Sequence, residues 1–185
     1  DLPYITNDNI KQAVSECLNT NPTDGMCTSG TKGAMPYWDV SKVTSMIGLF
    51  QSYKDFNSDI SRWDTSSVTG MDYMFFGASA FNQPIGNWKT SSVRSMGSMF
   101  SGASSFDRDI TGWSTDSLGN SGVRKDGTSS RPSNPVVPGM FYGATAWLAR
   151  FERFVSVDSI YDVTTAGPPS HWRRKTNSTT TPGGT

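Results

Sequence analysis

Side chains that could carry out catalysis are scarce in this sequence. Histidine occurs once, at His171, and the two glutamates, Glu16 and Glu152, lie near opposite ends of the chain. A glycosidase needs two facing carboxylates, and a Ser-His-Asp triad would have to use the single histidine. A lone histidine near the end of the chain is typical of a surface position. We therefore expect no catalytic residues and no enzyme activity.

Cysteine occurs only at Cys17 and Cys27, within the segment ECLNTNPTDGMC. The residues between them include Asn, Pro, Asp and Gly, which favour turns, so the two thiols can meet. A zinc site is the alternative, but a chain with two thiols and one histidine offers too few ligands. We expect a disulfide, which is typical of an oxidising, secretory compartment, and we expect no metal or other cofactor.

A third set of chemical groups is a column of hydroxyls that recurs at a constant spacing, at Thr65, Thr90 and Thr115. If these side chains point outward, they form a regular row of the kind that ice-binding proteins use. We therefore keep ice as a candidate ligand, beside a protein or a glycan. The column and a later basic segment together make the candidate binding surface, which consists of Thr65, Thr90, Thr115, Arg124, Lys125 and Arg131.

These residues belong to a 25-residue repeat that is marked by tryptophan, at Trp38, Trp63, Trp88 and Trp113. Within one unit, four apolar residues have the i, i+3, i+4, i+7 spacing of a helix face, namely Met71, Met74, Phe75 and Ala78. The WDTSSVT segment before them predicts a short strand. A period in the twenties indicates units that bury their apolar faces only against their neighbours. We predict an α/β fold, a short right-handed leucine-rich-repeat-like solenoid of about four 25-residue coils.

The repeat also predicts the organisation of the chain. Its parts are an N-terminal cap with the Cys pair, the repeat solenoid, an aromatic C-terminal cap, and a Thr/Pro/Gly-rich tail or linker, at residues 1–34, 35–147, 148–175 and 176–185. Residues 10–18 should form a helix in the N-terminal cap, since their apolar residues share one helical face. A Gly/Ser/Pro-rich insertion within about 119–139 delays the Met-Phe pair of the fourth unit. This insertion should be a projecting loop that either contributes to binding or is simply tolerated.

Bulk properties exclude some classes of partner. The net charge is zero, so nothing attracts the whole chain to nucleic acid or to an anionic membrane. No apolar run is long enough to span a membrane. The chain has neither an initiator Met nor a signal-peptide pattern, so we expect it to be a piece of a longer precursor. Asn177 begins an Asn-Ser-Thr triplet and is a candidate glycosylation site, or else part of a frayed terminus.

The repeated motif W-D-T-S-S-V-T-x-M-x-x-M-F-x-x-A-x-x-F-N-x-x-I-x-x-W extends from about Met35 to Trp147. It resembles the BspA-like leucine-rich-repeat family of surface proteins. The resemblance implies a secreted or cell-surface solenoid, and several members act as adhesins that bind host or matrix proteins. The family has no shared catalytic motif, so it supplies no active-site residue. Tyr53 departs from the pattern, because the other units have alanine in its column.

Together, these observations predict a non-enzymatic, secreted or cell-surface repeat protein that presents a binding surface for a protein or a glycan. The alternative is a structural or assembly subunit of a larger extracellular complex, which would pack or self-associate through a broad face. The small basic segment HWRRK, residues 171–175, is by itself a weak indication of nucleic-acid binding. We expect no nucleic-acid partner.

Overall fold

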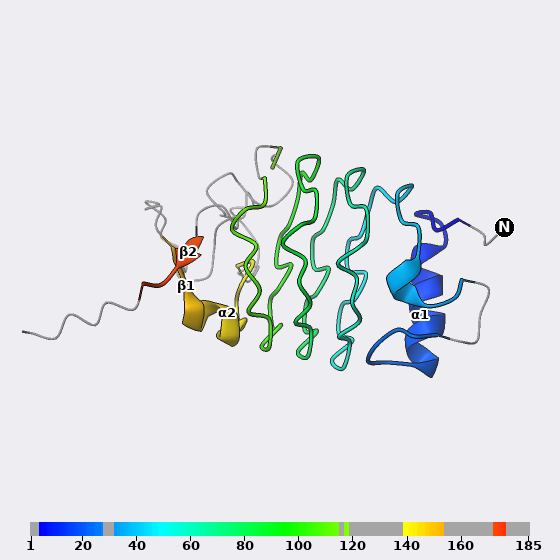
Figure 1. The fold of residues 1–185 in the computed structure, drawn as a ribbon, viewed down its shortest axis with the longest axis horizontal. Coiled ribbons are helices and arrows are strands. Elements are labelled where there is room, and N and C mark those ends of the chain that lie inside the picture. Colours follow the sequence, from blue (N-terminus) through cyan, green and yellow to red (C-terminus); the bar gives the residue numbers. More distant parts are fainter. Residues whose placement is uncertain (1–3, 28–31, 115–116, 119–138, 154–171, 177–185) are drawn as a thin grey trace, which may run out of the picture.

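The computed structural model describes residues 4–27, 32–114, 117–118, 139–153 and 172–176. Its named elements are α1 (Ile10–Thr20), the 3-10 helix η1 (Met35–Tyr37), α2 (Thr145–Arg150), β1 (Phe151–Arg153) and β2 (Trp172–Arg174). The rest of the described backbone is irregular. Figure 1 shows the middle of the molecule as a row of similar loops, with α1 at one end and α2, β1 and β2 at the other. No helix in the described ranges is long and apolar enough to cross a bilayer.

Successive 25-residue units pair through their backbones. Gly70 makes parallel bridges to Ser45 on one side and to Ser95 on the other. Every second amide of one unit donates to a carbonyl of the next at 2.7 to 2.9 Å, and the donors are Met71, Tyr73, Phe75 and Gly77. We call this hydrogen-bonded run, which comprises residues 46–52, 71–77, 96–102 and 140–143, the ladder. It satisfies backbone groups that the core would otherwise leave unpaired.

The fourth unit returns to this register after the insertion. Phe100 donates its amide proton to the carbonyl of Met140 at 2.9 Å, and the ring of Phe141 stacks on that of Phe100. The delayed Met140-Phe141 pair therefore occupies the Met-Phe column, as the sequence predicts. Most of the insertion, residues 119–138, lies outside the described residues.

The predicted helix within each unit is wrong. Residues 71–78 form two successive turns, in which Met74 donates to Met71 at 3.3 Å and Ala78 donates to Phe75 at 3.1 Å. The third residue of each turn has a positive φ, 58° at Tyr73 and 69° at Gly77, as a type II turn requires. Turn ends that recur every four residues have the same i, i+3, i+4, i+7 spacing as a helix face. The apolar pattern therefore does not distinguish the two structures.

The predicted strand in the WDTSSVT segment is also wrong. Residues 63–69 are irregular, and the parallel pairing beside them is limited to the single bridges at Gly70. The strands in the described residues are β1 and β2, which pair antiparallel at the C-terminal end. The α/β class thus fails in detail, and the chain is mostly irregular around a large buried aromatic cluster.

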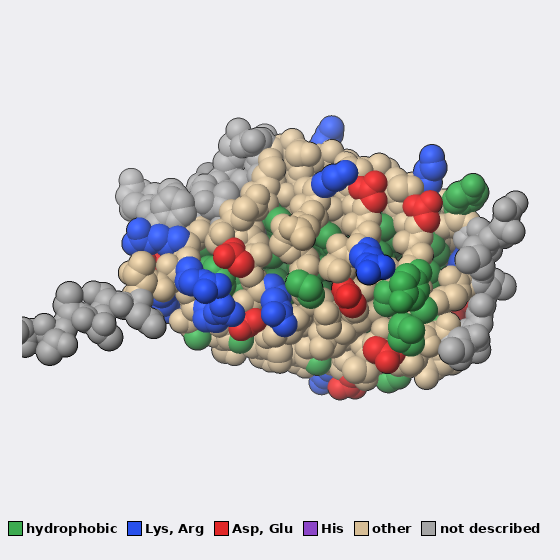
Figure 2. Space-filling model, viewed as in Figure 1, with side chains coloured by type: hydrophobic (Ala, Val, Ile, Leu, Met, Phe, Trp, Pro, Cys, Tyr) green, Lys and Arg blue, Asp and Glu red, His purple; other side chains and the backbone are tan. Residues whose placement is uncertain are grey.

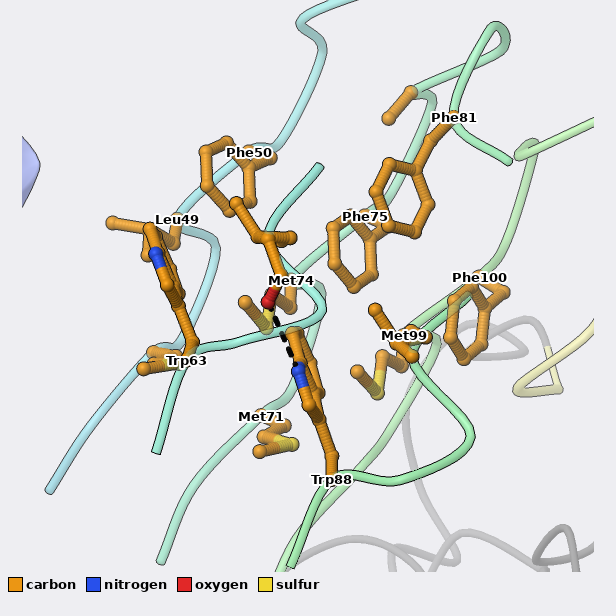
Figure 3. Close-up of a cluster of buried hydrophobic side chains, with 14 of the residues drawn as sticks. Leu49, Phe50, Trp63, Met71, Met74, Phe75, Phe81, Trp88, Met99 and Phe100 are labelled. Atoms are coloured by element: carbon orange, nitrogen blue, oxygen red, sulfur yellow. Dashed lines mark hydrogen bonds between the residues drawn. The ribbon is translucent and has the colours of Figure 1, made fainter. Parts of the chain in front are cut away.

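That cluster consists of aromatic rings stacked along the row of units (Figure 3). Ring centroids in the first column are 5.6, 5.4 and 5.9 Å apart, along Phe50, Phe75, Phe100 and Phe141. A second column, Phe56, Phe81 and Phe106, stacks at 5.6 and 5.9 Å. Each aromatic pair contributes about 0.5–1.5 kcal/mol beyond the burial of its area. Met74 and Phe75 are fully buried, which confirms that the regular spacing of the repeat places both residues in the core.

The recurring tryptophans link neighbouring units. Trp88 donates its indole Nε1–H to the carbonyl of Ile60 at 3.2 Å (Figure 3), and Trp113 donates to Ile85 at 3.1 Å. Trp63 makes the equivalent bond to Met35 at 3.1 Å. These buried indoles therefore pack their rings in the core while they satisfy a carbonyl of the preceding unit. The 25-residue period of tryptophan is a requirement of the fold and not of catalysis.

The N-terminal cap agrees with its prediction. One face of α1 is buried, and its residues are Ile10, Ala13, Val14, Cys17 and Leu18. Cys17 and Cys27 are paired at disulfide distance, with Cα atoms 5.2 Å apart. Asn7 Oδ1 accepts the amides of Thr44 and Ser45 at 3.0 and 3.1 Å. Asn7 thus pairs with backbone amides at the outer edge of the first unit. These amides would otherwise be available to a further unit.

The described part of the C-terminal cap is aromatic, as predicted. Trp147 and Phe151 are buried and stack at 4.5 Å. In the sequence these two residues share a helical spacing with Phe154, which lies outside the described residues; α2 ends at Arg150, and the chain then extends into β1. Trp172 from β2 completes the cap by an edge contact with Trp147 at 4.9 Å.

Candidate binding surface

The turns of the ladder separate its side chains into two sets. The first and last residue of each turn point inward, and in the second unit these are fully buried: Met71, Met74, Phe75 and Ala78. The residues between them face outward and are partly buried: Asp72, Tyr73, Phe76 and Gly77. We call the outward side of the ladder the ladder face. It is defined by Ile47, Asp72, Tyr73, Phe76 and Tyr142.

Tyr73 has the most unusual backbone on the ladder face. Its φ of 58° lies in the left-handed region, which costs a residue with a bulky side chain roughly 1–2 kcal/mol. Glycine is the residue that suits this position, and the preceding unit has Gly48 there with φ 63°. The half-buried Tyr73 ring meets the Phe76 ring edge-on, with centroids 5.9 Å apart. A strained tyrosine on a rigid frame points to a functional role.

Asp72, beside Tyr73, is held in one orientation by the third unit. Its Oδ1 accepts the amide of Gly97 at 2.7 Å, and its Oδ2 accepts the hydroxyl of Ser95. Gly97 lacks a side chain, which leaves room for the carboxylate to lean across the ladder. A carboxylate oxygen has capacity for a further donor, so Asp72 can accept a hydrogen bond from a ligand on the ladder face.

Two exposed apolar side chains flank this group along the row of units. Ile47 of the first unit is 40% exposed, and Tyr142 of the fourth unit is 55% exposed. Tyr142 follows Phe76 in one column, because Gly77 pairs with Ser101 and Gly102 pairs with Tyr142. In this column the ladder face therefore has an aromatic side chain in the second unit, Phe76, and in the fourth, Tyr142. The third unit, between them, has the small Ser101.

Sequence reasoning missed the ladder face, although the sequence contains a signal for it. The inward column is Phe50, Phe75, Phe100 and Phe141, whereas the next residues along the chain are Gln51, Phe76, Ser101 and Tyr142. A column that changes its chemistry while its neighbour stays constant indicates a position that the fold does not restrict. Alternation of this kind within a repeat identifies the outward side.

The predicted hydroxyl row at Thr65 and Thr90 is wrong. Both side chains are buried, with 1% and 2% exposure. Thr65 Oγ1 donates to the carbonyl of Lys89 at 3.0 Å, and Thr90 Oγ1 donates to Ser114 at 2.9 Å. These hydroxyls point into the stack because each has a carbonyl of the next unit as its acceptor. Thr65 and Thr90 therefore offer no hydroxyl row to ice and are not part of a binding surface.

The remaining predicted site residues lie outside the described residues: Thr115, Arg124, Lys125, Arg131 and Asn177. An exposed hydroxyl row exists elsewhere, at Ser79, Ser104 and Thr145. Each of these side chains donates to a carbonyl of the preceding unit, at 3.1, 3.4 and 3.3 Å. Their hydrogens are used within the protein, so these hydroxyls support the stack and leave only acceptors outward.

The carboxylates of the exposed turns have local structural roles. The Ser41 hydroxyl and amide donate to Asp39 and lower its pKa, and Ser66 lowers the pKa of Asp64 in the same way. No group of three metal-ligating side chains occurs within the part of the chain that the structure describes. A cavity of about 270 Å³ beside the N-terminal cap is lined by Pro22, Ser52, Tyr53, Lys54 and Asp55. It has one carboxylate and not the pair that acid–base hydrolysis of a glycosidic bond uses.

Comparison with known proteins gives one family. Residues 23–129, more than half of the chain, match the family model described as "Mycoplasma protein of unknown function, DUF285". No curated protein and no solved structure shows significant similarity to the chain. The matched range contains the paired units from the first ladder segment to the third. The chain therefore belongs to the DUF285 family.

Proposed function

We propose that this protein is a non-enzymatic recognition protein, secreted or at a cell surface, that binds a protein or glycan through the ladder face. We further propose that its stacked units are a solenoid of the BspA-like leucine-rich-repeat type. The constant register between units and the continuous ring columns support this architecture. The Cys17–Cys27 pair supports an oxidising compartment, and the single histidine of the sequence supports a role without catalysis.

The observation that carries the proposal is Tyr73. A glycine would suit its φ of 58°, and the next unit has the small Ser98 at the equivalent position with φ 52°, so Tyr73 is the bulky side chain among these three units. Tyrosine offers a large amphipathic contact area with only two side-chain torsions to immobilise, and it is enriched among the residues that dominate binding interfaces. Recognition of a ligand is the role that best accounts for this ring.

The frame behind Tyr73 is rigid, which favours binding. Its neighbours Met74 and Phe75 are fully buried, and Asp72 is held by two hydrogen bonds. A preorganised surface loses less conformational entropy when it binds. The combination of ring edges and faces with an acceptor carboxylate suits a sugar ring with its hydroxyl groups, or a peptide segment with its amides.

An assembly subunit is the second candidate, and the N-terminal end of the molecule favours it. Tyr4, Met26 and Tyr37 are 67%, 43% and 71% exposed there. Gly25 accepts the amide of Met35 at 2.9 Å, which brings the segments of Met26 and Tyr37 together. Exposed apolar side chains near the end of a repeat stack provide a surface on which a second copy or a larger complex can pack.

The test is binding of the full chain to a glycan array and to immobilised matrix proteins, with Tyr73→Gly as the variant. Tyr73→Gly should weaken the binding of a captured protein or uncharged glycan by about tenfold or more, as loss of an aromatic anchor does. Its unfolding free energy should stay within about 1 kcal/mol of the wild type, since relief of backbone strain offsets the lost ring contact. Tyr37→Ser, which removes an exposed tyrosine outside the ladder face, is the matched control.

Capture of no ligand on either panel, or equal affinity of Tyr73→Gly and wild type, would contradict the proposal. Sedimentation separates the second candidate from the first. If the chain self-associates and Tyr37→Ser disperses it while Tyr73→Gly does not, the protein is an assembly subunit.

A further inference from the structure

We propose that the C-terminal end of the molecule binds an acidic polysaccharide, one that carries sulfates or carboxylates along its length. The surface is formed by Arg108, Arg150, Arg173, Arg174 and Lys175, which we call the basic end. Figure 2 shows Lys and Arg side chains gathered over α2, β1 and β2. The proposal rests on the extracellular setting of the proposed function, but it concerns a surface other than the ladder face.

Pairing of β1 with β2 brings the backbones of two of these basic residues together. The register places Phe151 opposite Arg174, and one step further Lys175 donates its amide to the carbonyl of Arg150 at 2.7 Å. Arg150 and Lys175 are therefore backbone neighbours at the end of the strand pair, and Lys175 Nζ donates to the carbonyl of Leu148 in α2 at 2.8 Å. This gathering of cationic residues from α2 and β2 suits an anionic partner.

Carboxylates near the basic end neutralise only part of it. Arg150 pairs with Asp107 at 2.6 Å, and Arg173 pairs with Glu152 at 2.9 Å. Asp107 also lies 4.0 Å from Arg108, and Asp109 is next to Arg108 in the chain. Among the described residues, these three carboxylates set against the five cations, five minus three, leave two positive charges. The whole chain has a net charge of zero. The excess is therefore a local feature, and Arg174 and Lys175 carry it on exposed side chains.

The chemistry of the basic end favours a polysaccharide over a nucleic acid. Single-stranded nucleic acids bind proteins through aromatic side chains on which their bases stack, in addition to basic residues. The aromatic side chains of β1 and β2 that the structure describes, Phe151 and Trp172, are buried with 1% and 3% exposure. Long cationic side chains without an exposed ring suit a ligand whose charge repeats along a flexible chain, as in a sulfated or uronate polymer.

The experiment measures binding of the full chain to heparin and to polygalacturonate as the sulfated and carboxylated probes. Neutral dextran and a single-stranded DNA oligonucleotide serve as comparisons. The test variant is the double charge reversal Arg174→Glu with Lys175→Glu, which leaves in place the ion pairs of Arg108, Arg150 and Arg173. Lys11→Glu with Lys42→Glu is the control, since it changes the net charge equally at positions toward the other end.

We expect one or both acidic polysaccharides to bind with an affinity that falls as salt rises. The double reversal at the basic end should weaken binding by about tenfold or more, and the control should change it by less than about threefold. Absence of binding to both polysaccharides, equal losses in the two double variants, or tighter binding of the DNA would each overturn the proposal. Tyr73→Gly should leave heparin binding unchanged, so failure of the ladder-face proposal and failure of this one are distinguishable.

Discussion

The inward and outward sides of the ladder differ in how strictly they repeat. The inward column keeps phenylalanine in all four units, at Phe50, Phe75, Phe100 and Phe141, with stacked rings throughout. The outward column beside it changes from glutamine to phenylalanine, serine and tyrosine. Each inward ring must fit the ring of the next unit, because interiors are close-packed. In the outward column Phe76 is half-buried and Tyr142 is exposed, whereas Ser101 between them is buried. The fold therefore restricts the inward side in every unit and leaves the outward side available for recognition at Phe76 and Tyr142.

Phe75 and Phe76 are adjacent in the chain but belong to opposite sides of the ladder. Phe75 is fully buried, and Phe76 lies outward. Phe75→Ala should lower the unfolding free energy by about 3–5 kcal/mol, as large-to-small changes in a core do. Phe76→Ala should cost only about 1 kcal/mol, mainly through its contact with Tyr73. Urea denaturation of both variants measures the two values, and similar losses would show that the two sides are not distinct.

The sequence predicts the inward side well and the local backbone poorly. Constant columns such as Met74 and Phe75 locate the core, because burial against the next unit requires the same residue type in each repeat. The predicted helix fails since turn ends every four residues imitate a helical face. The polarity of a hydroxyl predicts that Thr65 and Thr90 lie outside, but the acceptor carbonyl that makes burial favourable belongs to the next unit. Contacts of that kind depend on the register in space and have no local signal.

The position of the ladder face also has no signal in hydropathy. Tyr73 has an apolar body and would be assigned to the core on composition alone. Its outward placement follows from the turn, whose third residue has a positive φ, and sequence analysis expects a helix there. The variable columns are a better indicator, since they identify outward positions without knowledge of the backbone.

Gly102 lies where the backbones of the second and third units approach each other closely. It has a φ of 75°, and a Cβ added to it would lie 3.4 Å from the Cα of Gly77. Gly102→Ala should cost about 1–2 kcal/mol through backbone strain, and the tight contact adds to this. Gly112→Ala is the control, since no atom lies within 4 Å of its added Cβ. Thermal unfolding that shows equal stability for both variants would argue against the close approach.

A substitution of Thr90 tests whether the threonine hydroxyls of the repeat are buried, as the structure shows. Thr90→Val keeps the shape of the side chain but removes the bond to the Ser114 carbonyl. The expected loss of stability is about 1 kcal/mol, typical of one neutral hydrogen bond with a buried acceptor. Ser91→Ala, at the exposed neighbouring residue, should change stability by less than about 0.5 kcal/mol. If Thr90→Val is as neutral as Ser91→Ala, the Thr90 hydroxyl faces solvent.

The smallest expected effect on stability comes from the exposed turns that connect the units. Carboxylates stabilise these turns by accepting hydrogen bonds. The hydroxyl and amide of Ser41 lower the pKa of Asp39 below 3.8, and Ser61 and Ser66 do the same for Asp59 and Asp64. A carboxyl whose pKa is lower in the folded state stabilises that state when it is ionised. This contribution is complete above the unfolded pKa near 3.8 and is lost as the pH falls through the lower folded values.

Solvent screens these three groups, so the loss should be small beside that of any core substitution. Replacement of Asp39, Asp59 and Asp64 by Asn keeps an acceptor for each turn but removes the charge. The unfolding free energy of the triple variant should therefore fall less steeply than that of the wild type when the pH is lowered from 5 to 3, about the range in which a carboxyl titrates. Urea denaturation at several pH values measures both slopes. Equal slopes would mean that these turns contribute nothing to stability through charge.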